Sequence, residues 1–244
     1  MLRLRGSRLS RLLSGKMIPK KVHISGTVDA FRIILEDRLL RAGASITDDS
    51  NSADITVSMG EESSAEIAIV AADSHHGEAD LVVRVHDLLV PEGAHRWGSQ
   101  TIYQWADWVM DGADGEPIYD DPRHWVHVRD ATDALAILIL SENTTSGIID
   151  LCGRRPWSRE SIITELSLLW GRFTDAVQHT HTVSSLTGSN SPVTSEETHA
   201  IRPDLGPLHK ALLRAGGDGW RPVVPMRVSL MEILAHRGEG EDSA

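Results

Sequence analysis

The sequence is poor in cysteine. Its 244 residues include a single cysteine, Cys152, which excludes a disulfide framework and a cysteine-based zinc cluster. It also contains no apolar run long enough to cross a bilayer, so we expect a soluble protein. Because a disulfide framework is excluded, the chain suits a reducing compartment, and we expect it in the cytoplasm.

Basic residues are scarce outside the first part of the chain. The sequence carries 24 Lys and Arg against 35 Asp and Glu, a formal net charge of −11. Seven basic and no acidic residues fall within residues 1–21, so the rest carries 17 basic against 35 acidic side chains, a charge of −18. A body of this charge repels phosphates, which argues against nucleic-acid binding as its role.

The first residues of the chain differ from the rest in composition. Residues 1–16, MLRLRGSRLSRLLSGK, interleave leucines with basic residues and contain no acid. This pattern is typical of a transit-type targeting peptide, or of a helix that binds a membrane surface or a partner. A third reading is upstream sequence that is translated although the true start is Met17. On each reading, residues 1–20 are a basic extension outside the fold.

Apolar periodicity predicts alternating strands and helices. A β-prone run at residues 21–25 precedes a helical segment that Gly43 ends, and its apolar residues share one helical face: Phe31, Ile34, Leu35 and Leu39. Further strands are predicted at residues 44–47, 54–59, 66–71, 81–85, 125–128 and 148–152, and further helices at residues 99–110, 131–140 and 208–214 and after Ser158. This order predicts an α/β fold with a Rossmann-like parallel sheet and flanking helices.

Three local features complete this expectation. Asp130 is expected to be the N-cap of helix 131–140, and Ser158 the N-cap of the helix that follows it. Residues 174–200 are rich in Ser, Thr and Asn, and we expect a mobile loop there. The stretch between strands 66–71 and 81–85 is too short for a crossover helix. Either these strands pair differently, or a helix has been deleted.

Four blocks, in order, resemble a known family. VHISGTVDAFRIILEDRLLRAGASIT is similar to the family's first βαβ unit, and RVHDLLVPEG resembles its Arg-x-x-Asn-x-Tyr-Gly-Pro segment. DPRHWVHVRDATDALAILI resembles its Arg-Asp-Phe-Val-His-Val-x-Asp helix, and LGPLHKALLRAGGDGWRPVVPMRVSLMEIL its closing segment with a Gly-Trp-x-Pro turn. This family is the extended short-chain dehydrogenases/reductases, the NAD-dependent nucleotide-sugar epimerases and dehydratases.

The resemblance implies a domain organisation and a set of binding residues. Residues 21–244 are expected to form one Rossmann-like domain of the NAD(P)-binding type, with residues 174–244 as a small C-terminal lobe that binds substrate. The cofactor implied is NAD(P), and the substrate a nucleotide or nucleotide-sugar. The residues that match the cofactor motif are Ser25, Gly26, Thr27 and Asp48, although Asp48 can equally be an ordinary turn aspartate. Those expected to bind substrate are Arg84, Asp87 and Arg123.

The chain departs from the family's pattern where the chemistry takes place. Asp29 and Arg32 replace the second and third glycines of the dinucleotide fingerprint, which normally let the backbone approach the cofactor pyrophosphate. We expect Arg32 to point outward into solvent. The family's Tyr-x-x-x-Lys pair has no match, because neither Tyr103 nor Tyr119 has a lysine four residues on. Ser74 is the residue that matches the family's active-site hydroxyl.

Histidines and tryptophans offer two further hypotheses. His124 and His127 are three residues apart in a predicted strand, so they face opposite sides and do not share a metal, and no metal site is expected. Trp97, Trp105 and Trp108 lie close together in the sequence. They either pack in the core or between lobes, or they form a stacking wall for a nucleobase or sugar near Arg84 and Arg123.

Two functions from different classes remain open at this stage. The first is a divergent NAD(P)-dependent epimerase/dehydratase homologue that lacks the catalytic Tyr-x-x-x-Lys and has an eroded fingerprint. The second is a pseudoenzyme that serves as a nucleotide-binding or protein-assembly module. Whether the chain is an enzyme, and whether it forms a homo-oligomer or binds another protein, is left open by the sequence.

Overall fold

A parallel β-sheet forms the centre of the molecule. The computed structural model describes residues 19–60, 63–180, 182–183 and 200–241. Six strands form the sheet in the order β2-β1-β3-β4-β5-β8, all parallel, and β6 and β7 form a separate two-stranded sheet. This confirms the Rossmann-like α/β prediction. The strands are β1 (Lys21–Gly26), β2 (Ser45–Ile46), β3 (Ile55–Met59), β4 (Ala65–Ala71), β5 (Ala79–Val85), β6 (Leu88–Leu89), β7 (Val126–His127) and β8 (Gly147–Leu151).

One face of the sheet is covered by α1 (Ala30–Arg41), α3 (Val128–Leu140) and α6 (Gly206–Arg214). Helix α1 shows why the sequence folds this way, because Phe31, Leu35 and Leu39 recur at every fourth residue and are all buried against the sheet. The main hydrophobic core therefore lies between these three helices and alternate residues of the strands.

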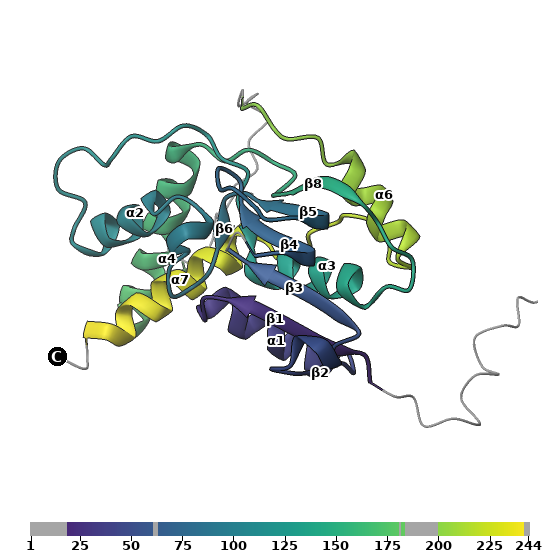
Figure 1. The fold of residues 1–244 in the computed structure, drawn as a ribbon. Coiled ribbons are helices and arrows are strands. Elements are labelled where there is room, and N and C mark those ends of the chain that lie inside the picture. The colour runs from purple at the N-terminus through teal and green to yellow at the C-terminus, as the bar shows by residue number, and fades with distance from the viewer. Residues whose placement is uncertain (1–18, 61–62, 181, 184–199, 242–244) are drawn as a thin grey trace, which may run out of the picture.

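Among the described residues, no helix covers the other face of β3, β4 and β5 (Figure 1). Strands β4 and β5 pair in parallel from Ala65↔Ala79 to Ala71↔Val85, although only residues 72–78 connect them. Seven extended residues span roughly 23 Å, which matches the length of one strand, so the chain returns without a helix. The two strands therefore pair in parallel without a helix between them, and the deletion of a helix there stays a prediction.

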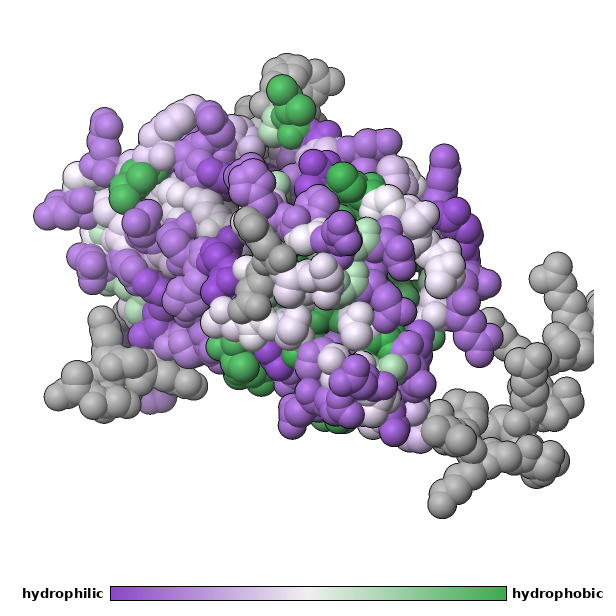
Figure 2. All heavy atoms as spheres, viewed as in Figure 1, coloured by the Kyte–Doolittle hydropathy of each residue, from purple (hydrophilic) through white to green (hydrophobic). Residues whose placement is uncertain are grey.

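The buried apolar cluster on this face is small and consists of Ala68, Val70 and Val82. In the same view, Figure 2 shows mostly hydrophilic side chains over α2 and paler ones over the strands.

A second hydrophobic cluster lies beside the sheet and joins distant parts of the chain. It is built by α2 (Thr101–Met110), α4 (Arg159–Val177) and α7 (Met226–Glu241), with Trp105 fully buried. Glu165 of α4 and Arg227 of α7 form a two-point ion pair at 2.7 and 2.9 Å. The C-terminal lobe predicted at residues 174–244 stays a prediction. No helix of the described residues is long and apolar enough to cross a membrane.

Some local expectations need correction. His127, and not Asp130, caps α3, because its ring accepts the amide of Arg129. Asp130 lies inside the helix and accepts the amides of Val223 and Val224. The prediction of a loop at residues 174–200 was wrong for its first residues, because α4 continues to Val177. Residues 181 and 184–199 of the predicted loop lie outside the described residues. The N-cap role of Ser158 is confirmed.

The basic segment 1–16 and Met17 also lie outside the described residues. Lys20, at the end of the predicted extension, donates to the carbonyl oxygens of Ile139 and Ser141 at 2.9 and 3.2 Å.

Candidate functional site

The turn between β1 and α1 carries three of the predicted cofactor residues. Gly26 has φ +108°, and a Cβ there would collide with the carbonyl oxygen of Met59, so the position requires glycine because β3 approaches closely. Ser25 Oγ lies 3.4 Å from the carbonyl of Val57, to which it donates, and Thr27 is exposed. The tight turn expected after β1 is therefore present.

Side chains of the protein fill the N-terminus of α1. The carboxylate of Asp29 accepts the Arg32 amide at 2.9 Å and the Trp97 indole N–H at 2.7 Å. A helix N-terminus is the place where this class of fold normally receives a phosphate, because its free amides point outward. Here the amide that a phosphate would use is bound to a carboxylate of the chain itself.

Arg32 does not point into solvent as expected. Its guanidinium donates to the carbonyl of Gly26 at 2.6 Å and pairs with Glu36 at 2.7 Å, and its side chain is only 15% exposed. The arginine thus lies across the β1–α1 turn. Asp48 is separate from these contacts, in the exposed loop after β2.

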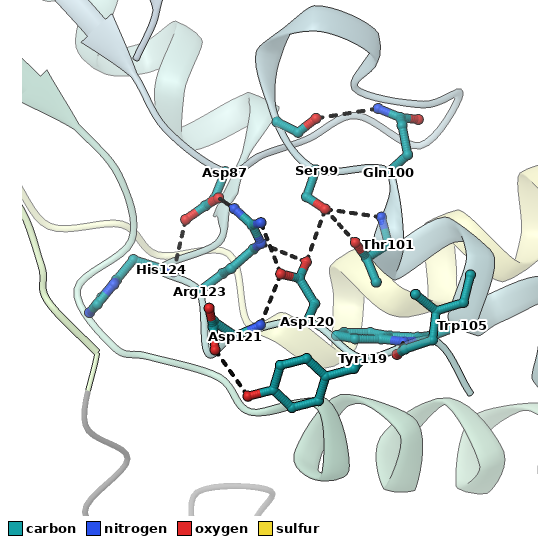
Figure 3. Close-up of polar contacts among 12 residues, drawn as sticks. Asp87, Ser99, Gln100, Thr101, Trp105, Tyr119, Asp120, Asp121, Arg123 and His124 are labelled. Atoms are coloured by element: carbon teal, nitrogen blue, oxygen red, sulfur yellow. Dashed lines mark hydrogen bonds and ion pairs between the residues drawn. The ribbon is translucent and has the colours of Figure 1, made fainter. Parts of the chain in front are cut away.

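A charged cluster lies beyond the end of β5 (Figure 3). Arg123 donates to Asp120 at 2.7 and 2.9 Å and to Asp87 at 3.1 Å. Asp87 also accepts the amide of His124 at 3.1 Å, and its left-handed backbone, φ +48°, aims the carboxylate at both groups. Ser99 donates to Asp120 at 3.0 Å. The structure therefore brings together two of the three predicted substrate residues.

These contacts fix the ionisation of the cluster. Burial opposes the charge on Asp120, yet the hydrogen bonds and charge of Arg123, together with hydrogen bonds from Thr101 and Ser99, outweigh it and hold the pKa of Asp120 below its ordinary value. The same hydrogen bonds raise the pKa of Arg123. Arg123 is thus a cation that two carboxylates already neutralise.

Arg84, the third predicted substrate residue, belongs to a different group. It donates to Asp150 at 2.8 Å, and His86 contacts the other oxygen of Asp150 at the same distance. Although burial opposes ionisation, these two partners lower the pKa of Asp150. No contact joins Arg84 to Asp87 or Arg123 among the described residues.

The hydroxyl groups of both tyrosines form hydrogen bonds within the chain. Tyr103 is buried, donates to the carbonyl of Val90 at 2.8 Å and accepts its amide at 3.1 Å, and burial raises its pKa to about 12. The exposed Tyr119 donates to Asp121 at 3.0 Å, and this hydrogen bond raises its pKa. Ser74 lies in the exposed turn after β4, with its amide on the carbonyl of Ala71 at 2.9 Å.

The three tryptophans do not form one wall. Trp97 stacks edge-on against Phe31 at 5.0 Å in the main core, whereas Trp105 is buried in the second cluster and donates to Ile118 at 2.7 Å. Trp108 donates to the carbonyl of Asp114 at 2.9 Å. The core-packing interpretation therefore describes Trp97 and Trp105. In the described part of the chain, no group of three metal-ligating side chains lies together, and His127 contacts Glu232 instead.

Several residues of these clusters had no signal in the sequence. Asp150 is an ordinary acidic residue by composition, and only the fold places it against Arg84, whereas Asp120 lies just three residues before Arg123. Asp29 was recognisable as a substituted glycine, but its bond to Trp97 spans 68 residues and follows from the tertiary structure.

The parallel sheet, its helices and the second cluster define a Rossmann-type protein with the fold of the NAD-dependent epimerases and dehydratases. One similar structure is RMD from Pseudomonas aeruginosa with NADPH, at 12% identity and TM-score 0.57, covering 91% of this chain and 98% of that one. A second is WbmF from Bordetella bronchiseptica with NAD+ and UDP, at 10% identity and TM-score 0.55, covering 92% and 94%. UDP-glucose 4-epimerase from Thermus thermophilus with NAD is 12% identical, with TM-score 0.54, covering 89% and 99%.

At sequence identities this low, the similarity establishes the fold alone. The activity has to be argued from the residues of this chain. Comparison with protein-family models and with curated proteins gave no match.

Proposed function

We propose that this chain is a non-catalytic relative of the epimerases and dehydratases, a binding or assembly module that keeps the scaffold without hydride transfer. The observation that carries the proposal is the Asp29 carboxylate at the N-terminus of α1, held by the Arg32 amide and the Trp97 indole. The similar structures carry NADPH, NAD or NAD+, which makes NAD(P) the cofactor to test.

The residues of the β1–α1 turn do not fit a dinucleotide as they stand. A pyrophosphate carries about two negative charges and needs free amides at the helix N-terminus. Asp29 places a carboxylate there, and Arg32 is held by Gly26 and Glu36. A dinucleotide would have to displace both side chains and break the Asp29–Trp97 bond.

The hydrogen bonds and the pKa of Tyr103 also support the proposed absence of hydride transfer. An acid–base tyrosine works best when its pKa lies near the operating pH. Burial moves the pKa of Tyr103 to about 12, and its hydroxyl is already bound on both sides to Val90. Its role is therefore structural.

A nucleotide or nucleotide-sugar at Arg84, Asp87 and Arg123 is likewise disfavoured. A diphosphate needs arginines whose charge is available. Arg84 is paired with Asp150, and Arg123 with Asp87 and Asp120. A ligand at this position would have to compete with three carboxylates.

Thermal melting with NAD+ and NADP+ tests the proposal. We expect millimolar cofactor to leave the melting temperature of the natural chain unchanged, since a ligand stabilises only the state it binds. The comparison is the double variant Asp29→Gly, Arg32→Gly, which restores both glycines. A shift of several degrees in the natural chain would contradict the proposal and favour the divergent, cofactor-binding homologue.

A further inference from the structure

The loop after α2 exposes charged and apolar side chains together. Figure 1 shows the chain leaving α2 as a wide loop beside the body. Residues 111–116 of this loop are all exposed, and Ile118 and Tyr119, which follow, are 55% and 71% exposed. Large apolar side chains grouped on an exposed loop are typical of a surface that contacts another protein.

The tip of this loop carries three carboxylates, those of Asp111, Asp114 and Glu116. Within the described part of the chain, none of the three forms an ion pair. Asp120, further along the loop, is different because it binds Arg123. The negative charge at the tip is therefore available to a partner.

A cleft of about 550 Å³ carries the opposite charge. It lies between the chain after β8, strand β7 and the segment that leads into α7, and three exposed arginines line it: Arg154, Arg155 and Arg221. None of these three is ion-paired with a residue that the structure describes. Arg202 also lines the cleft, but it donates to the carbonyl oxygen of Arg154 at 2.8 Å. Three guanidinium groups can therefore bind carboxylates, as arginine does with two parallel hydrogen bonds.

The uncharged part of the cleft suits a polypeptide. Trp125 lines it and is only 4% exposed, and its Nε1 has no hydrogen-bond partner among the described residues. Buried donors are normally satisfied, and a backbone carbonyl oxygen of an inserted loop would satisfy this one. Trp157 and Pro222 add a partly exposed apolar surface. Asp130, the acidic residue of the lining, already accepts two backbone amides and does not oppose an acidic loop as a free carboxylate would.

The loop and the cleft are neighbours on the molecule. Backbone hydrogen bonds of 2.9 and 3.2 Å join Arg123, at the end of the loop, to Trp157 at the cleft. The guanidinium of Arg159 lies 5.6 Å from the centre of the Tyr119 ring. The loop does not fill the cleft of its own chain, because none of residues 111–119 lines it. A two-fold axis beside both would place the loop of each copy at the cleft of the other.

We propose that two copies of this chain form a closed dimer, in which residues 111–119 of each copy bind the arginine-lined cleft of the other. The carboxylates of the loop tip pair with Arg154, Arg155 and Arg221, and a loop carbonyl accepts the Trp125 N–H. Opposite charges on the two surfaces let a chain with a net charge of −11 associate with itself. This inference names the partner in the assembly role proposed above and rests on that proposal.

Analytical ultracentrifugation of the natural chain tests the dimer. We expect a dimer at micromolar concentration, with a dissociation constant that rises several-fold as salt increases, because exposed charges are screened. A natural chain that stays monomeric at millimolar concentration would overturn the inference.

Charge reversal tests the contact itself. The cleft variant Arg154→Glu, Arg155→Glu sets carboxylates against the loop, and the loop variant Asp114→Lys, Glu116→Lys sets cations against the cleft. Each variant alone should dimerise at least about tenfold more weakly, because like charges then face each other. An equimolar mixture of the two should form a heterodimer, since both of its contacts again join opposite charges. A mixture that stays monomeric would contradict the contact between loop and cleft.

The matched control reverses two acidic residues elsewhere. The variant Asp73→Lys, Glu78→Lys, in the exposed link between β4 and β5, makes the same change in net charge and should dimerise as the natural chain does. An equal loss of dimer in this control would show that net charge governs association, and would overturn the inference. Melting curves show whether each variant is folded. Melting with NAD+ reports on dinucleotide binding and not on the dimer, so the failure of either proposal can be told from the failure of the other.

Discussion

The carboxylate of Asp29 lies 2.7 Å from the indole nitrogen of Trp97. Its other oxygen caps α1 through the Arg32 amide, so one side chain ties the start of the first helix to the turn at residues 95–97. Trp97 in turn packs on Phe31 inside the main core. Asp29, which replaces a glycine of the dinucleotide fingerprint, thus makes structural contacts within the fold.

Asp29 and Trp97 should be energetically coupled. Asp29→Ala removes an N-cap and should lower the free energy of unfolding by about 1–2 kcal/mol. Trp97→Phe keeps most of the packing but loses the indole donor. In a double-mutant cycle by urea denaturation, we expect a coupling energy of about 1 kcal/mol or more. Strictly additive effects would show that the bond contributes nothing.

Tyr103 should matter for stability and not for proton transfer. Tyr103→Phe leaves the amide and the carbonyl of Val90 without their partner and should cost about 1–3 kcal/mol. Ultraviolet titration should show no ionisation of this phenol below pH 11 or so, because burial raises its pKa to about 12. Tyr119→Phe, at an exposed position, is the control and should change stability by less than about 0.5 kcal/mol. Ionisation of Tyr103 near neutral pH would argue for an acid–base role.

The Asp150 group should make the fold sensitive to acid. The folded pKa of Asp150 lies below its ordinary value, so its stabilisation is present above the unfolded carboxyl pKa of about 4 and is lost as the pH falls through the folded pKa. Asp150→Asn should lower the free energy of unfolding at pH 7 by about 1–2 kcal/mol, a figure reduced for the partial exposure of Arg84. Denaturation of the natural chain and of the variant at pH 7 and pH 3 measures this difference in the free energy of unfolding. An equal loss at both pH values would mean that the charge of Asp150 is irrelevant.

His127 should contribute a second, milder pH dependence. Burial lowers its pKa despite Glu232, and Arg129 and Asp130 are the other charges close to it. Because the folded protein resists protonation here, stability is full above the unfolded histidine pKa of about 6.5 and decreases as the pH falls below it. His127→Gln should flatten the fall in melting temperature between pH 7 and pH 5. His76→Gln, in an exposed loop, is the control and should leave that slope as it is.

The periodicity of the sequence was sufficient for most of the fold. Every predicted strand is present within a few residues, and the stripe that includes Phe31, Leu35 and Leu39 is buried as expected. The cap of α3 was misplaced because Asp130 looks like an N-cap residue in isolation. Its actual partners, Val223 and Val224, are more than ninety residues away, where no local pattern reports them.

The candidate sites were less predictable, because side-chain pairing is decided across the sheet. The sequence placed Arg84 and Arg123 in one pocket, yet Arg84 is held by Asp150 of β8, and Arg123 by Asp87 and by the neighbouring Asp120. A cleft lined by Arg154, Arg155, Arg202 and Arg221 was not predicted from the sequence. Its lining residues are spread from Leu89 to Ser229, and only the packing of loops around α3 and α7 assembles them.

The sequence by itself determined the order of most strands and helices, the short link between β4 and β5, and the loss of the fingerprint glycines, since all three are local properties of the chain. It did not predict β6 or α7. The tertiary structure decided what replaces those glycines and which charges are neutralised. The physical reason is that hydrogen bonds and ion pairs depend on distances of about 3 Å, which residues far apart in sequence reach only after the core has formed. Asp29 and Trp97 meet only because α1 and the turn at residues 95–97 pack on the same core.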